Sequence, residues 1–185
     1  MRISLLVIVS LISLLASCGS ADLAVLNEVN MFSPKWQEVS QQFAFVKRNV
    51  ERAVPIYKDY LAEVEPRIDE SDLSKKAELL TLRNRYREVL REGEKIHESY
   101  KSSYGDLKTT VTSFNEFQTR LMRNKLSAAE ARADFATYKV QYRDVKQKAF
   151  EMQSALVKNI ESHNSISSAI ADLLGDYQTF KIETH

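Results

Sequence analysis

The chain has 185 residues, a length that suits one domain. Its 26 Lys and Arg residues nearly balance its 25 Asp and Glu residues, so bulk charge gives no indication of nucleic-acid binding. Only 4 glycines and 3 prolines are present among many charged residues, which favours long helices over sheet, and one cysteine excludes a disulfide framework within the chain.

The first 17 residues have the features of a secretory signal peptide. A single charge at Arg2 precedes an apolar run from Ile3 to Leu15, and small residues follow before Cys18. The run is too short for a comfortable membrane span, which needs about 20 residues. We therefore predict that residues 1–17 are removed from the mature protein.

The end of this segment consists of Leu15, Ala16, Ser17 and Cys18. It resembles the lipobox of bacterial lipoprotein precursors, in which leucine comes first, small residues follow and cysteine ends the motif. The resemblance covers residues 1–20 only. It implies cleavage before Cys18 and attachment of diacylglycerol, and of a further acyl chain such as palmitate, to that residue. Two or three acyl chains would make release from the membrane slow.

The same resemblance implies a location in the cell envelope. Gly19 follows the cysteine, at the position where an aspartate resembles an inner-membrane retention signal in enteric bacteria. If the host has two membranes, we therefore expect the protein on the outer membrane, facing the periplasm. The covalent lipid is the only non-protein group that we expect, and no other cofactor.

Residues 18–33 are expected to form the lipidated N-terminus, as a tether or as a short helix. Apolar residues at helical spacing lie in this segment: Val25, Val29 and Phe32. Ser33 and Pro34 then predict a helix start, because serine suits the N-cap and proline suits the first helical position.

A long helix is expected to follow Pro34. Its apolar residues recur at steps of three and four that alternate almost throughout, a heptad seam with a period of about 3.5 residues. The seam comprises Trp36, Val39, Phe43, Val46, Val50, Ala53, Tyr57, Leu61, Val64 and Ile68.

Two further prolines, Pro55 and Pro66, lie within or at the end of this helix. Pro55 removes one backbone donor, so we expect a kink there, but the seam keeps its register and the helix should keep its direction. Pro66 predicts that the helix ends at or near the preceding residue. A turn over residues 66–71 would follow, with Asp69 or Ser71 capping the next helix.

The second helical run is the longest. Its seam comprises Leu79, Leu82, Tyr86, Val89, Gly93, Ile96 and Tyr100, and then Tyr104, Leu107, Val111, Phe114 and Leu121. The step from Tyr100 to Tyr104 breaks the alternation, as an inserted stutter would. Either one helix continues with a local defect near Gly105, or a turn occurs there and Asp106 caps a new helix. Matching to the lengths of the other helices favours the single helix.

The last helix has clear signals at both ends. Residues 123–127 predict a turn, and Ser127 and Glu130 have the spacing of a capping box. Gly175 is a good terminator. Residues 176–185 form a tail without a clear pattern, in which Tyr177 and Phe180 are candidates for packing on the bundle end.

These elements predict an all-α fold, an elongated antiparallel three-helix coiled-coil-like bundle over residues 34–175. Three rods of similar length, joined by turns at opposite ends, bury all three seams. The alternative is a four-helix bundle broken near Gly105. Buried seam aromatics such as Trp36, Phe43, Phe114 and Phe135 can hold such a bundle as a monomer.

A stripe of cations runs along the second helix at four-residue spacing: Arg83, Arg87, Arg91 and Lys95. Such a stripe can bind an anionic partner, namely lipid headgroups, a glycan polymer or an acidic protein. The simpler interpretation, which we favour, is pairing with Glu88 and Glu92 on the same helix, or with Asp59 and Glu63 across the bundle.

Metal and ligand sites have little support. Glu94 and His97 share a helix face, as in di-iron carboxylate proteins, but the chain has no second Glu-x-x-His, so they are weak candidates. Asn159 and His163 lie on or beside the seam and should fix its register. A hydrophobic groove could open where aromatics meet the small residues Gly93 and Ala149.

No nucleophile constellation or phosphate-binding loop is present in the sequence, so we expect no enzymatic activity. We expect a scaffold, spacer or adaptor that contacts the bilayer through its anchor and binds an envelope protein or cell-wall component, but not nucleic acid. One alternative is a periplasmic carrier or chaperone-like binder of a hydrophobic ligand or chain. A metal-binding helical protein is the less favoured alternative.

Overall fold

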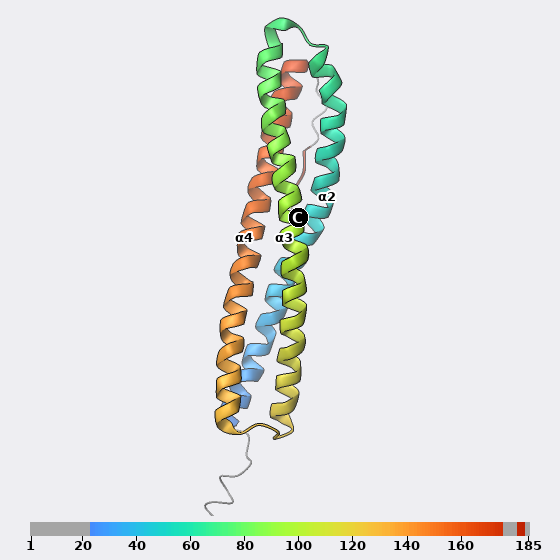
Figure 1. Ribbon diagram of the computed structural model, residues 1–185. Coiled ribbons are helices and arrows are strands. Elements are labelled where there is room, and N and C mark those ends of the chain that lie inside the picture. Colours follow the sequence, from blue (N-terminus) through green and yellow to red (C-terminus); the bar gives the residue numbers. More distant parts are fainter. Residues whose placement is uncertain (1–22, 176–180, 184–185) are drawn as a thin grey trace, which may run out of the picture. The chain divides into compact units, whose positions relative to one another are not determined.

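The computed structural model describes residues 23–175 and 181–183. Three helices follow one another, α2 (Leu23–Asp69), α3 (Leu73–Met122) and α4 (Ala128–Leu174), and they pack as a three-helix bundle (Figure 1). The predicted all-α three-helix fold is therefore confirmed. The predicted signal peptide with Cys18 and Gly19, and the tail residues Tyr177 and Phe180, lie outside the described residues.

The described chain forms two compact units, and each contains a segment of every helix. Unit 1 comprises residues 23–39 and 106–146, and unit 2 comprises residues 40–105, 147–175 and 181–183. The turn between α3 and α4 belongs to unit 1, and the turn between α2 and α3 belongs to unit 2.

The core of unit 1 is a cluster of aromatic rings centred on Phe32 of α2. Its ring centroid lies 5.4 Å from that of Phe135, 5.1 Å from Tyr142, 6.0 Å from Phe114 and 6.2 Å from Trp36. All five side chains are buried. Because the five rings come from α2, α3 and α4, this cluster joins the three helices of the unit.

The predicted helix start at Ser33 and Pro34 is wrong, because α2 begins at Leu23 and continues through Pro34. Burial explains the difference. Phe32 and Trp36 are both buried, and burying such a side chain contributes about 1.5–3 kcal/mol each. Together these contributions, about 3–6 kcal/mol, offset the cost of about 3 kcal/mol for one proline inside a helix.

The predicted end of this helix before Pro66 is also wrong, since α2 continues to Asp69. Ile68 is fully buried in the last turn, which favours the extra helical residues. The backbone N–H of Glu70 donates to the carbonyl of Pro66 at 3.1 Å. Asp72, and neither Asp69 nor Ser71, directly precedes α3.

Pro55 does not split α2, as expected from the unbroken seam.

The four-helix alternative is wrong, because α3 is helical throughout and Gly105 lies inside it. Aromatic contacts within unit 2 support this stretch of α3. The rings of Tyr100 and Tyr104 stack with centroids 5.5 Å apart, and both lie within 6.3 Å of the Phe43 ring.

The predicted capping box at the start of α4 is confirmed. The Ser127 backbone N–H donates to Oε2 of Glu130 at 2.8 Å, and the Glu130 N–H donates back to Oγ of Ser127 at 3.3 Å. At the other end, Gly175 follows α4 with φ of 69°, the left-handed conformation that terminates helices.

The described tail residues, 181–183, pack on the helices of unit 2. Ile182 is buried, its N–H donates to Oδ1 of Asn164 at 2.9 Å, and Nδ2 of Asn164 donates to its carbonyl at 3.0 Å. The guanidinium of Arg52 in α2 donates to the carbonyl of Glu183. This segment therefore contacts both α2 and α4, a contact that the sequence pattern did not predict.

Candidate functional site

A buried polar layer crosses unit 2. The hydroxyl of Tyr86 in α3 lies 2.7 Å from Nδ1 of His163 in α4, and His163 is fully buried. The Tyr57 ring of α2 packs on the His163 ring at a centroid distance of 4.7 Å. Burial is the main cause that raises the pKa of Tyr86 above its ordinary value, with smaller contributions from Tyr60 and Tyr57.

Two further hydrogen bonds extend this layer. Nδ2 of Asn159 donates to the carbonyl of Val89 at 2.8 Å, which joins α4 to α3. The hydroxyl of Tyr60 donates to the carbonyl of Ser167 at 3.0 Å, which joins α2 to α4. These contacts hold the three helices in one register, the role that the seam positions of Asn159 and His163 predicted.

The space beside Gly93 is filled. A Cβ placed on Gly93 would lie 3.1 Å from Cε2 of Tyr57 and 3.3 Å from Oδ1 of Asn159, and Ala149 is fully buried. The hydrophobic groove expected near Gly93 and Ala149 is therefore absent at Gly93, because the Tyr57 ring occupies the room that glycine leaves. The Tyr57 hydroxyl and Oδ1 of Asn159 have no hydrogen-bond partner among the described residues.

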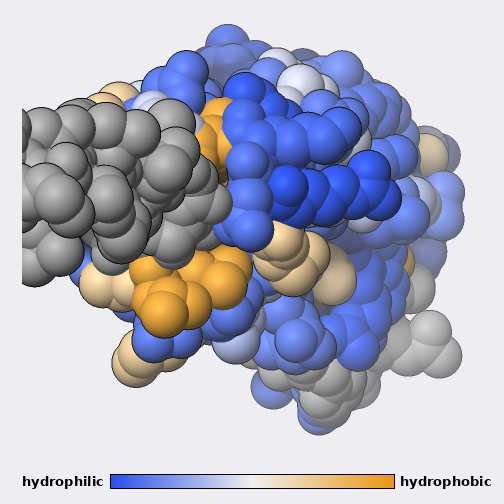
Figure 2. Space-filling model, turned by 90° about the horizontal axis from the view of Figure 1, so that it is seen from below, coloured by the Kyte–Doolittle hydropathy of each residue, from blue (hydrophilic) through white to orange (hydrophobic). Residues whose placement is uncertain are grey.

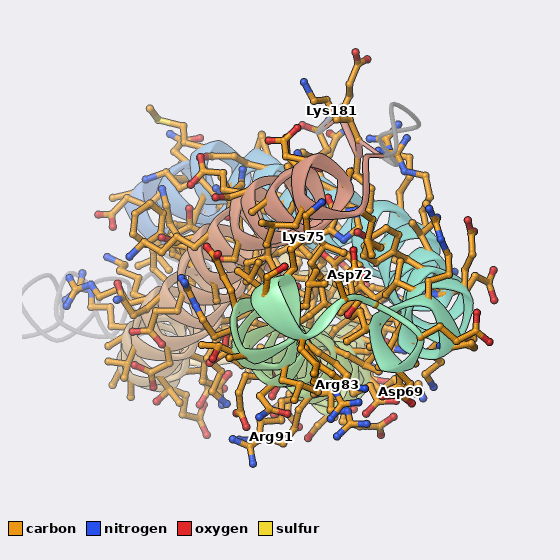
Figure 3. All side chains as sticks on the ribbon, turned by 90° about the horizontal axis from the view of Figure 1, so that it is seen from above. Asp69, Asp72, Lys75, Arg83, Arg91 and Lys181 are labelled. Atoms are coloured by element: carbon orange, nitrogen blue, oxygen red, sulfur yellow. The ribbon has the colours of Figure 1, made fainter. Side chains whose placement is uncertain are left out.

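Three members of the cationic stripe on α3 lie beside carboxylates. Nη1 of Arg83 is 3.3 Å from Asp69 (Figure 3), and Nη2 of Arg87 is 2.5 Å from Glu65. Arg91 pairs with Glu88, one turn before it on α3. The expectation of neutralising partners thus holds for these three, and that of an anionic partner has no support from their geometry.

The partners across the bundle differ from those expected. Asp59 and Glu63 were the expected partners, whereas the carboxylates of α2 that pair with the stripe are those of Glu65 and Asp69. The cause is the continuation of α2 beyond Pro66, which places Asp69 within reach of Arg83.

The weak metal candidates are not brought together with further ligands. Glu94 is exposed and pairs with Nζ of Lys58 at 2.8 Å, and His97 is half-buried. Within residues 23–175 and 181–183, no group of three or more His, Cys, Asp or Glu side chains is placed to hold a metal ion.

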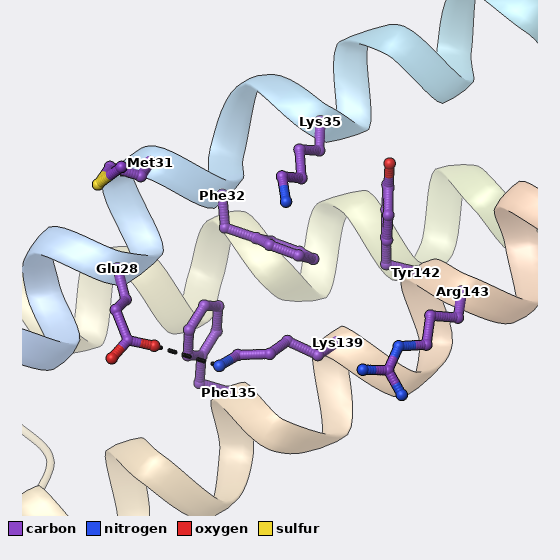
Figure 4. Close-up of a pocket in the computed structure, with 8 residues that line it drawn as sticks. All are labelled: Glu28, Met31, Phe32, Lys35, Phe135, Lys139, Tyr142 and Arg143. Atoms are coloured by element: carbon purple, nitrogen blue, oxygen red, sulfur yellow. Dashed lines mark hydrogen bonds and ion pairs between the residues drawn. The ribbon is translucent and has the colours of Figure 1, made fainter.

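An open groove of about 390 Å³ lies between α2 and α4 in unit 1 (Figure 4). We call it the basic groove, and its lining residues are Glu28, Met31, Phe32, Lys35, Phe135, Lys139, Tyr142 and Arg143. The three aromatic side chains are buried, so they form a floor beneath the longer polar side chains.

The cations of the basic groove sit beside this aromatic floor. Nζ of Lys139 lies 3.2 Å from Oε2 of Glu28 and 4.3 Å from the centroid of the Phe135 ring. Nζ of Lys35 lies 5.3 Å from the centroid of the Phe32 ring. The aliphatic stems of the lysines can thus cover apolar rings while their charges stay at the surface.

The basic groove was not expected from the sequence pattern. Lys139 and Arg143 are four residues apart on α4, a signal that was available but is common on exposed helix faces. Their proximity to Lys35 depends on the continuation of α2 through Pro34, which the local sequence pattern did not predict.

Comparisons with protein-family models, curated proteins and solved structures gave no match to this chain. Within residues 23–175 and 181–183, no helix combines the length and apolar character that a membrane span requires.

Proposed function

We propose that the protein is a lipid-anchored component of a bacterial cell envelope whose three-helix bundle acts as a scaffold, spacer or adaptor. The observation that carries this proposal is the position of Cys18. It ends a lipobox-like sequence, and α2 begins only five residues later at Leu23.

The short connection has a mechanical consequence. Five residues span at most about 17 Å when fully extended. A lipid on Cys18 would therefore hold the first turn of α2 close to the bilayer surface. Each buried methylene of the acyl chains adds roughly 0.8 kcal/mol to membrane binding, so several chains make the attachment durable.

The bundle itself supports a role in binding rather than catalysis. Its interior is occupied by its own side chains, since Tyr57 fills the space at Gly93 and aromatic rings fill the core of unit 1. Partners would therefore be recognised on outer faces of the helices. Two large apolar side chains of α4 are available there, since Val140 and Phe150 are both exposed.

Site-specific photocrosslinking in cells tests this role. A photoreactive amino acid replaces Val140 in one variant and Phe150 in another, and exposed Lys158 is replaced as the control position. We expect a discrete crosslinked envelope component from Val140 or Phe150 that is not obtained from Lys158. In a Cys18→Ala background this product should be strongly reduced.

Two results would contradict the proposal. One is a crosslinking pattern that is the same at all three positions, because it would indicate random collision. The other is an undiminished product in the Cys18→Ala background, because a scaffold held at the membrane depends on its anchor.

A further inference from the structure

Charge is unevenly distributed over unit 1. Its described residues include nine Lys and Arg and seven Asp and Glu, a surplus of two cations. The basic groove alone has three cations, Lys35, Lys139 and Arg143, against the single carboxylate of Glu28, so its surplus of two equals that of the whole unit.

Two of these cations are available to an anion from outside. Lys139 already contacts Glu28. Among the described residues, no carboxylate forms an ion pair with Lys35 or Arg143. The basic groove therefore presents two positive charges beside an aromatic floor.

Exposed apolar side chains accompany these charges. Met31 lines the basic groove and is 80% exposed. At the end of unit 1, Leu23 is 72% exposed and Met122 is 56% exposed, and the exposed cations Arg123 and Lys125 follow Met122 in the turn.

The register of α2 against α3 places these groups at one end of unit 1. Nε2 of Gln118 donates to Oδ1 of Asn30 at 3.0 Å, and the two helices run in opposite directions (Figure 1). Along the helix axes, the residues that follow Gln118 therefore lie beside the residues that precede Asn30. Met122 and the turn between α3 and α4 thus lie near the height of Leu23. Figure 2 views this end and shows an orange apolar patch next to blue hydrophilic surface.

We propose that this surface of unit 1 rests on the anionic phospholipids of the membrane, with the basic groove binding a lipid phosphate. Lipid headgroups offer negatively charged partners for Lys35 and Arg143. The bilayer interface below the headgroups accepts exposed apolar side chains such as Met31 and Leu23. Mixed cationic and apolar surface is typical of proteins that lie on bilayers.

This inference rests on the proposed anchor for its choice of a membrane as the partner. The connection from Cys18 to Leu23 spans at most about 17 Å, and the groove begins at Glu28, about 8 Å further along α2. An anchored chain would thus hold the groove within reach of headgroups at a high effective concentration.

Vesicle co-sedimentation tests the inference without the lipid anchor. The unlipidated chain of residues 19–185 keeps every described helix. We expect it to bind vesicles that mix phosphatidylglycerol with phosphatidylcholine, and not vesicles of phosphatidylcholine alone. High salt should weaken this binding, because it screens exposed charges.

A pair of double variants locates the binding surface. Lys35→Glu with Arg143→Glu should weaken binding to the anionic vesicles roughly tenfold or more, because each Lys or Arg near such a surface strengthens binding about fivefold. Lys108→Glu with Lys158→Glu makes the same change in net charge at other exposed positions and should leave most of the binding intact. Circular dichroism confirms that both variants fold.

Equal binding to neutral and anionic vesicles, or no binding to either, would overturn the inference. So would an equal loss in both double variants, which would mean that net charge alone acts. Because this chain lacks the lipid, these outcomes are separate from failure of the proposed anchor, which the mass of the protein from cells reports.

Discussion

At the scale of single residues, two glycines of α3 differ in what surrounds them. Gly93 faces the ring of Tyr57 and the side chain of Asn159, whereas among the described residues a Cβ placed on Gly105 would meet no side chain and no neighbouring helix within 4 Å. Tyr57 cannot retreat easily, because it is fully buried and packed on the His163 ring. Alanine should therefore have opposite effects at the two positions.

We predict that Gly105→Ala raises the free energy of unfolding by about 0.5–1 kcal/mol, since alanine favours helix over glycine. Gly93→Ala should lower it by about 1 kcal/mol, because overpacking costs more than the gain in helix propensity. Urea unfolding of both variants measures this difference. Stabilisation by both substitutions would show that the side chains of the polar layer in unit 2 can shift to make room for the added methyl group.

The buried tyrosines predict a loss of stability at alkaline pH. Burial raises the pKa of Tyr57 and of Tyr86 above their ordinary value of 10.0. In the unfolded chain both hydroxyls ionise near pH 10, while in the folded chain they stay protonated. Their contribution is therefore complete below pH 10 and declines as the pH rises from there towards the raised folded values.

Ultraviolet absorbance and circular dichroism, recorded together during an alkaline titration, check this prediction. The absorbance of these two tyrosinates should appear only as helicity is lost. Tyr57→Phe should reduce the alkaline sensitivity and be nearly neutral at pH 7, because the Tyr57 hydroxyl has no hydrogen-bond partner among the described residues. Ionisation of every tyrosine while the helices remain intact would be inconsistent with the buried layer.

At the scale of elements, the capping box determines where α4 begins. Hydrogen bonds from Ser127, through its side chain first and then its backbone, lower the pKa of Glu130. A lowered pKa in the folded state means that this contribution is present above the ordinary value and is lost as the pH falls through the folded value.

We predict that Ser127→Ala lowers the free energy of unfolding by about 1 kcal/mol at pH 7. It should also move the pKa of Glu130 back towards its ordinary value of 4.5. Thermal unfolding and an NMR titration of Glu130 report the two effects. An unchanged pKa of Glu130 would show that the Ser127 hydroxyl does not stabilise the charged Glu130 carboxylate.

The element boundaries show which structural features the sequence could predict. The capping box and Gly175 act through neighbours in the chain, so the ends of α4 were predictable. Ser33 and Pro34 carry the same kind of local signal, yet α2 continues through them. The deciding contribution there is burial of Phe32 against rings of α3 and α4, which local sequence does not encode.

The candidate sites show the same difference between contacts within one helix and contacts between distant parts of the chain. The pair of Arg91 and Glu88 lies within one helix and follows from spacing alone. The partner of Arg83 depends on where α2 ends, and the basic groove depends on how α2 passes α4. The packing of Ile182 against Asn164 depends on where the tail returns, which no periodicity predicts.

At the scale of the whole molecule, the proposed protein combines a lipid anchor with a helical bundle. The proposed lipid on Cys18 would set the distance from the membrane, the basic groove of unit 1 would bind headgroups, and the outer faces of the helices would bind a partner. The distance from the membrane and the binding of an envelope partner both depend on Cys18 being the first residue of the mature, lipid-modified chain, and the choice of a membrane as the partner of the basic groove rests on it too.

Intact mass and membrane fractionation of the protein from its host, beside a Cys18→Ala variant, test this claim most directly. We predict that the wild type begins at Cys18, carries the mass of diacylglycerol and acyl groups, and sediments with membranes, while the variant carries no lipid. A mature protein that is cleaved without lipid and recovered in the soluble fraction would contradict the account.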